Sequence, residues 1–249
     1  MKKKSVFSIL SFYFLQIIIL ILFAFISQIL FRNSEILSVV FRYALALLSI
    51  FLINKFWLKQ EVNFGFHNVS IKDQYSSYFL TLLIFVAYFY SFRPNDLAQP
   101  LTDVLCFSIG PGIFEEYVNR GLILTALINK FKEKGYIYIL MSVLISSFLF
   151  GLMHFINFIF MAQSLPNTIV QVINATAFGF IASAIYIRTK NIFLVMFIHF
   201  FTDFSVGILN TIWDNNYALY MLDILFILFT FLLLKSKNKI NVLVNNHIN

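Results

Sequence analysis

The sequence predicts an all-α, polytopic membrane protein with about eight transmembrane helices. Hydrophobic residues make up 60% of the 249 positions, and the mean hydropathy is +0.86. Charged residues make up only 12%, fewer than a soluble domain of this length needs for its surface. Long apolar stretches are separated by short polar ones, as in chains that cross a bilayer repeatedly. We therefore expect one integral membrane domain over residues 1–249.

Each apolar stretch has roughly the 17–25 residues that a helix needs to cross the hydrocarbon core. The breaks between stretches carry charges or turn-forming residues, as in RNSE, RPNDLAQP and SLPN. The predicted spans are residues 6–31, 36–53, 76–92, 103–129, 137–160, 168–187, 192–211 and 217–234.

Positive charge is distributed asymmetrically over these spans. With the N-terminus in the cytoplasm, 14 of the 18 lysines and arginines fall in cytoplasmic segments. Arg32 and Arg93 fall in outer segments, and Arg42 and Arg120 lie within spans. The positive-inside rule predicts this bias, so we expect both termini in the cytoplasm. The same bias accounts for the net charge of +7 without a nucleic-acid partner. The cytoplasmic set is Lys2, Lys3, Lys4, Lys55, Lys59, Lys72, Lys130, Lys132, Lys134, Arg188, Lys190, Lys235, Lys237 and Lys239.

The stretch PGIFEEYVNRGL places three charges inside the fourth span. An ionisable side chain at the bilayer centre costs roughly 2.5–3.5 kcal/mol, so such residues usually have partners or a function. Glu116 and Arg120 are four residues apart on one helical face and can neutralise each other. Glu115 points elsewhere and lacks that partner, which suits a general base. The alternative is a charge cluster that only holds helices together.

A glycine-proline-glycine sequence at residues 110–112 precedes these charges. Proline removes a helix donor and glycine permits irregular backbone, so we predict that the helix is interrupted here. A new helix would begin near Pro111 and place Glu115 and Glu116 at its positive end.

Two further spans each contain a histidine. His154 lies four residues from both Phe150 and Phe158, whose rings we expect on its face. His199 and Asp203 are also four apart, and they could bind a metal together or the aspartate could orient the imidazole. Each group alone could be a buried structural hydrogen bond. Two histidines and several carboxylates on three helices can also converge in one bundle.

Depth in the membrane complicates this convergence. At 1.5 Å per residue from the cytoplasmic ends, Glu115 lies about 21 Å deep, His154 about 25 Å and His199 about 10 Å. Helix tilt or an irregular helix is needed to bring them together. Arg42 and Asp223 lie in the outer parts of their spans, where we expect a structural pair.

Three motifs resemble those of a known family. EEYVNR fits EExxxR, FGLMH fits FxxxH and HFFTD fits HxxxN/D, in this order on separate spans. The chain resembles the CPBP intramembrane proteases, bacterial relatives of the CAAX prenyl endopeptidase type 2 that are also called the Abi family. The resemblance covers roughly residues 104–207, and we expect residues 104–211 to form the motif-bearing catalytic core.

The resemblance implies that a peptide bond is hydrolysed at the membrane. Glu115 would be the general base that activates water, assisted by His154. His199 and Asp203 would polarise the scissile carbonyl and hold the oxyanion. The residues that shape the site would be Glu116, Arg120 and Phe150.

The resemblance leaves metal dependence open, because the family is described both as metalloproteases and as metal-free glutamate-dependent proteases. Its last motif position is often Asn, whose amide can donate to an oxyanion. An ionised Asp203 cannot donate, so it is protonated, orients His199 or ligates a metal. Glu115, His154, His199 and Asp203 would make a reasonable ligand set for Zn²⁺, although the HExxH motif is absent.

The favoured hypothesis is an intramembrane endopeptidase in a bacterial cell membrane, with a peptide or membrane-protein substrate. It would act in bacteriocin self-immunity or in processing a membrane-associated peptide. The alternative is a non-catalytic membrane immunity or signalling protein that binds a partner through a vestigial site. A transporter that uses Glu115 and Asp203 as proton carriers is a third hypothesis, without support from an inverted repeat.

Overall fold

The computed structural model describes residues 3–65, 71–91, 100–208, 217–235 and 240, and these residues are built from helices. Within these ranges the only β-type pairing is an isolated bridge between Phe64 and Asn191. The predicted all-α class is therefore confirmed.

The helical elements follow the predicted spans closely, with several spans divided into consecutive elements. Two elements are π-helices (η1 and η2) and one is a 3₁₀-helix (η3). The order is α1 (Val6–Leu30), α2 (Glu35–Ile53), η1 (Asn54–Leu58), α3 (Ile71–Ser91), α4 (Leu101–Glu116), η2 (Tyr117–Leu124), α5 (Thr125–Phe131), η3 (Lys132–Lys134), α6 (Tyr136–Met153), α7 (Phe155–Phe160), α8 (Leu165–Thr189), α9 (Ile192–Ile208) and α10 (Tyr217–Leu234).

The outer surface of the bundle is apolar, as expected of a multi-pass membrane protein. Large hydrophobic side chains such as Phe7, Ile18 and Phe197 are more than half exposed. A soluble protein does not expose apolar side chains so densely, whereas lipid is a suitable environment for them. Helical segments that are long and apolar enough to cross a membrane are Val6–Leu30, Glu35–Leu58, Tyr136–Phe160 and Leu165–Thr189. The number of eight spans and the cytoplasmic termini stay predictions.

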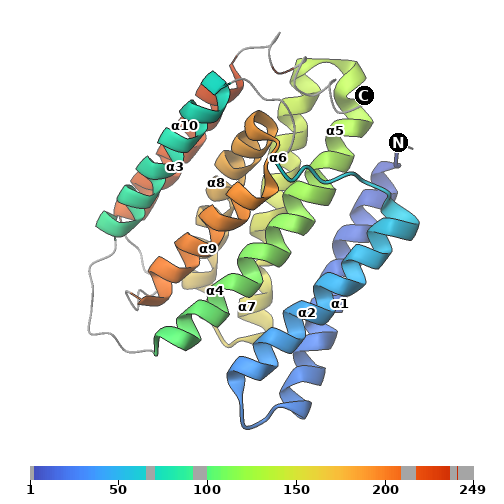
Figure 1. The fold of residues 1–249 in the computed structure, drawn as a ribbon, viewed down its shortest axis with the longest axis vertical. Coiled ribbons are helices and arrows are strands. Elements are labelled where there is room, and N and C mark those ends of the chain that lie inside the picture. Colours follow the sequence, from blue (N-terminus) through green and yellow to red (C-terminus); the bar gives the residue numbers. More distant parts are fainter. Residues whose placement is uncertain (1–2, 66–70, 92–99, 209–216, 236–239, 241–249) are drawn as a thin grey trace.

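The motif-bearing helices form the centre of the bundle. α4 packs against α9, and α6 packs against α8. The α1–α2 hairpin covers α4 on one side, and α3 and α10 lie on the opposite side (Figure 1). The charged motifs are thus surrounded by other helices and shielded from the lipid-facing surface.

The predicted helix break at the glycine-proline-glycine sequence is wrong. α4 continues through Pro111 as far as Glu116. A Cβ atom on Gly112 would lie 2.9 Å from the backbone nitrogen of Phe200, and one on Gly110 would lie 2.4 Å from the Tyr43 ring. These glycines therefore allow α9 and α2 to approach α4 closely. A single proline is tolerated because membrane helices can satisfy the freed backbone groups locally.

The irregular backbone lies after the glutamates, where η2 begins at Tyr117. π-helical turns often occur at functional sites. Here the turn carries Arg120 into the centre of the bundle, where the side chain is completely buried. A Cβ atom on Gly121 would lie 3.2 Å from Val62, so the connection after η1 packs closely against η2.

The depths counted for Glu115, His154 and His199 stay predictions. The start of α9 is covered by the connection after η1. Lys190 is only 6% exposed, and the Ile192 amide donates to the Asn63 carbonyl at 2.9 Å.

Candidate active site

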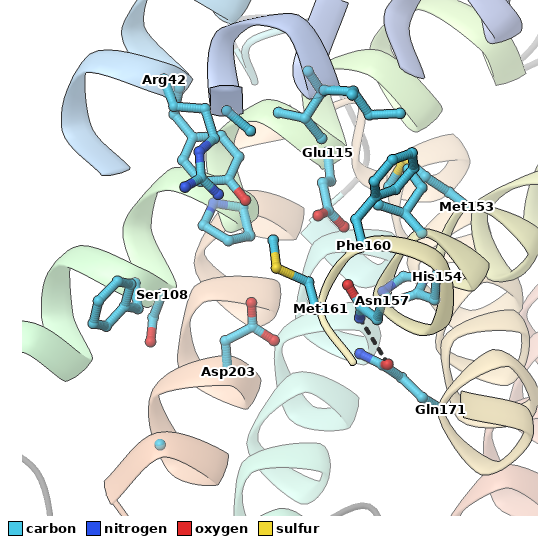
Figure 2. A pocket seen from close by; sticks show the side chains of 18 of the residues that line it. Arg42, Ser108, Glu115, Met153, His154, Asn157, Phe160, Met161, Gln171 and Asp203 are labelled. Carbon is cyan, nitrogen blue, oxygen red and sulfur yellow. Dashed lines mark hydrogen bonds between the residues drawn. The ribbon is translucent and has the colours of Figure 1, made fainter. Parts of the chain in front are cut away.

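One cavity of about 380 Å³ brings the three sequence motifs together. Glu115 lines it from α4, His154 from the junction of α6 and α7, and His199 and Asp203 from α9. Figure 2 shows the side chains of Glu115, His154 and Asp203 around the same space. Residues almost ninety positions apart in the chain thus share one chemical environment.

Behind the cavity, Glu116 connects Arg120 to His199. Its Oε1 atom accepts from Arg120 Nη1 at 2.7 Å and lies 2.8 Å from His199 Nδ1. The predicted pair of Glu116 and Arg120 is therefore confirmed. Both side chains are completely buried, so this contact is made in a low-dielectric region. Because a carboxylate only accepts, His199 Nδ1 carries the proton in this hydrogen bond.

The other nitrogen of His199 faces the cavity. Nε2 lies 3.5 Å from Asp203 Oδ2 and 3.9 Å from Glu115 Oε2. Both ring nitrogens are therefore directed toward carboxylate oxygens, an arrangement that favours the doubly protonated imidazolium. Asp203 does not hold His199 Nδ1, because Glu116 occupies that position. Asp203 instead lies beside the nitrogen that can reach a substrate.

His154 occupies a turn between two helices. α6 ends at Met153, and the next residue, His154, has φ −69° and ψ −10°. Its Nδ1 atom lies 3.1 Å from the Phe150 carbonyl oxygen, which can only accept. Nδ1 therefore carries a proton, and Nε2 of the neutral ring is left as an acceptor. The expected second ring contact from Phe158 is not found among the described residues, because Phe158 lies beyond this turn and is 45% exposed.

Two buried phenylalanines hold the charged groups in place. The Phe150 ring lies edge-on to His154 at 5.2 Å and to His199 at 5.7 Å. The Arg120 guanidinium lies over the same ring, 4.3 Å from its centroid, as in a cation–π contact. Phe178 of α8 adds a ring 5.2 Å from His199. Phe178 belongs to no motif, and one aromatic among 33 phenylalanines offers no sequence signal.

Other polar residues of the cavity lie outside the motifs. Arg42 of α2 and Gln171 of α8 line it (Figure 2). Asn157 of α7 donates to Gln171 Oε1 at 2.9 Å. The sequence does give a signal for these residues, because each is a polar side chain within a predicted apolar span. The expected pair of Arg42 with Asp223 is wrong, because Asp223 accepts from Asn174 of α8 on the far side of the bundle.

The predicted metal ligands do not form a ligand set in this geometry. Among the residues that the structure describes, no group of three or more His, Cys, Asp or Glu side chains could hold a metal ion.

Comparison with protein families gives a match over the same part of the chain. Residues 97–205 match the family described as type II CAAX prenyl endopeptidase Rce1-like. The chain matches the Rce1-like family. The resemblance to CPBP intramembrane proteases is thereby confirmed, and α4 to α9 fall within the matched segment apart from the end of α9. A search of curated proteins found no matching relative.

The family and the fold agree on a general description. The Rce1-like match supports a protease of the CAAX endopeptidase kind, and the apolar helices make it a multi-pass membrane protein. Arg42 lies on α2, outside the matched segment, although it lines the same cavity.

Proposed function

We propose that this chain is an intramembrane endopeptidase that hydrolyses a peptide bond with water activated by Glu115. The observation that carries the proposal is the shared cavity of Glu115, His154, His199 and Asp203. A carboxylate base, a neutral imidazole acceptor and an imidazolium donor together can activate water and stabilise an oxyanion without a metal.

Water is activated between Glu115 and His154. Glu115 lines the cavity, and its Oε2 atom is buried without a hydrogen-bond donor among the described protein groups, so a water molecule bound in the cavity would supply the donor that this carboxylate lacks. His154 Nε2 can accept the second hydrogen of the same water molecule, which orients an oxygen lone pair toward the substrate. Glu115 takes one proton as the water oxygen bonds to the carbonyl carbon. It later gives this proton to the leaving nitrogen when the C–N bond breaks.

The developing oxyanion is stabilised by His199. Its Nδ1–H is held by Glu116, and its Nε2–H is directed into the cavity. A donor held in place before the reaction stabilises the developing charge without having to reorganise. Glu116 is thus a positioning residue, and Arg120 in turn holds Glu116 through the 2.7 Å contact.

Asp203 serves as a second donor in its protonated form. It lines the cavity beside His199 Nε2 and retains some exposure, with a side chain that is 34% accessible. A protonated carboxyl group donates one hydrogen bond, as the amide of Asn does at the same motif position. An ionised Asp203 would repel the oxyanion, so this role requires the proton.

The test compares membranes that contain the wild-type chain with membranes that contain Glu115→Gln at an equal protein level. Peptide mass spectrometry should find new termini only with the wild type. Repeating the reaction in water enriched in oxygen-18 should place the heavy isotope in the new carboxylate, because hydrolysis takes that oxygen from water.

The competing hypotheses give different results in this experiment. If no new termini appear and a cellular phenotype survives in both Glu115→Gln and His154→Ala, the partner-binding hypothesis replaces the protease. Metal analysis of the purified chain provides a separate readout. If the chain binds a stoichiometric metal and loses cleavage when the metal is removed, the metal-free mechanism is wrong but the protease function stands. Bacteriocin self-immunity and processing of a membrane-associated peptide would be distinguished by the identity of the cleaved protein.

A further inference from the structure

Arg42 is a cationic group in the cavity that no motif assigns. It lies within α2, and its side chain extends toward the space that Glu115 and Asp203 also face (Figure 2). Its Nε atom is buried and has no hydrogen-bond acceptor among the residues that the structure describes. A buried N–H donor without an acceptor is costly, so a bound group that supplies an acceptor would stabilise Arg42 in this position.

The site carboxylates do not provide that acceptor. Glu116 is committed to Arg120 and His199 at 2.7 and 2.8 Å. Glu115 and Asp203 lie 3.9 and 3.5 Å from His199 Nε2 instead. The planar guanidinium presents several N–H donors in a geometry that matches a carboxylate.

We propose that Arg42 binds a carboxylate of the substrate and so determines which peptides enter the cavity productively. This inference rests on the proposed protease function for the identity of the ligand as a peptide. The carboxylate can be the peptide's own C-terminus or an Asp or Glu side chain near the cleaved bond. In either case Arg42 contributes to binding and has no part in activating water.

The test uses the full-length chain in lipid nanodiscs and synthetic apolar peptides made in matched versions. One pair differs only in a free or amidated C-terminus, and another differs only in an internal Glu or Gln. Binding and cleavage are measured separately for wild type, Arg42→Lys and Arg42→Gln. Arg32→Gln is the matched control, because Arg32 is exposed in the turn after α1 and does not line the cavity.

We expect the wild type to bind one carboxylate-bearing peptide on the order of tenfold or more tightly than its neutral partner. Arg42→Gln should remove that preference while binding of the neutral peptide is retained, which also shows that the variant is folded. Arg42→Lys should retain part of the preference, and Arg32→Gln all of it. Which pair shows the preference identifies the terminal or the internal carboxylate.

Three outcomes would overturn the assignment. A wild type without any preference, or a preference that persists in Arg42→Gln, removes the carboxylate subsite. An equal loss of kcat on charged and neutral peptides, with binding unchanged, would place Arg42 on the reacting carbonyl instead. Since binding is read without cleavage, a failure of the protease proposal would be seen separately.

The cavity opens at one end of the bundle, and the distribution of basic residues between the two ends indicates on which side of the membrane that end lies. The cavity lining includes Gln28 near the end of α1, and Phe160 and Met161 at the end of α7, which are all exposed. These residues lie at the end of the bundle formed by the α1–α2 and α7–α8 turns (Figure 1).

The basic segments lie at the opposite end. Lys3 forms an ion pair with Glu133, which brings the N-terminal segment beside the lysine-rich turn after α5. The residues of that end also include Lys55, Lys59, Lys130, Lys132, Lys134 and Lys235. The positive-inside rule assigns such an end to the cytoplasm.

We infer that the cavity opens to the non-cytoplasmic side of the membrane. The substrate would then be an exported peptide or the outer end of a membrane-spanning segment. This statement depends on the orientation of the chain and holds whether or not the chain is a protease.

Cysteine labelling in intact cells tests the orientation. The native Cys106 is replaced by serine, and a single cysteine is introduced as Gln28→Cys at the cavity mouth or Lys134→Cys at the basic end. A membrane-impermeant maleimide should label Gln28→Cys in intact cells, and Lys134→Cys only after the cells are permeabilised. Labelling of denatured protein gives the total for each variant. The reverse pattern, or labelling of both in intact cells, would overturn the inference.

Discussion

The two adjacent glutamates of α4 lie in opposite environments. Glu116 is completely buried and has both Arg120 and His199 as partners. Glu115 lines the cavity, and its Oε2 atom lacks a hydrogen-bond donor among the described protein groups. The two glutamates therefore differ in their surroundings: Glu116 is held by Arg120 and His199, whereas Glu115 faces the cavity, where we propose that it activates water.

Removing the Arg120 partner of Glu116 should have the largest effect on stability. Arg120→Met removes one of the two partners of the buried Glu116 carboxylate, and we expect a loss of about 3–5 kcal/mol in the free energy of unfolding. Reversible unfolding in mixed detergent micelles measures it. The double variant Arg120→Met with Glu116→Gln removes both charges and should recover part of the loss. Equal destabilisation by the single and double variants would show that the ion pair is not the cause.

Substituting Glu115 should affect activity and leave stability almost unchanged. Glu115→Gln keeps the size and polarity of the side chain but removes the base, so we expect about a 10²–10⁴-fold loss of kcat. The midpoint of thermal unfolding should stay within a few degrees of the wild type. An active Glu115→Gln, or one as unstable as Arg120→Met, would contradict the division between the two glutamates.

Substitutions of Asp203 should have an intermediate effect, because Asp203 lies beside Nε2 of His199, which faces the cavity. Asp203→Asn keeps a hydrogen-bond donor and should retain cleavage within about tenfold of the wild type. Asp203→Ala removes the donor and should lose on the order of 10²-fold in kcat. Cleavage of one synthetic peptide by both variants decides the point. Loss of activity in the Asn variant together with loss of a bound metal would instead identify Asp203 as a ligand.

The exposed pair of Lys3 and Glu133 should give the smallest effect. The hydrogen bond from Lys3 lowers the pKa of the Glu133 carboxyl group below its ordinary value. Any stabilisation is therefore present at neutral pH and is lost as the pH falls through the lowered pKa. Because both partners are in water, Glu133→Gln should not measurably change the unfolding midpoint at neutral pH. A shift comparable to that of Arg120→Met would show that burial does not separate the two ion pairs.

Much of the helical architecture follows from local properties of the chain. Apolar stretches long enough to cross a bilayer predict helices, since backbone groups in lipid must be satisfied within the segment. Glu116 and Arg120 are neighbours on any helix at a spacing of four, and their pair was predictable for that reason. The family match supports the same motifs, while the catalytic roles of individual residues stay proposals.

Other features depend on contacts between segments far apart in the chain. α4 continues through Pro111, and the flanking Gly110 and Gly112 allow α2 and α9 to approach it closely. The connection after η1 covers the start of α9, where the Ile192 amide donates to the Asn63 carbonyl.

The sequence alone therefore determined the membrane class, the helical segments and the residue types available for chemistry, because these depend on composition and short-range spacing. The tertiary structure decided that Glu116, rather than Asp203, holds His199 Nδ1, and that Arg42 joins the cavity from outside the matched segment. Those outcomes depend on how helices cross and how close their backbones come, which no local pattern encodes.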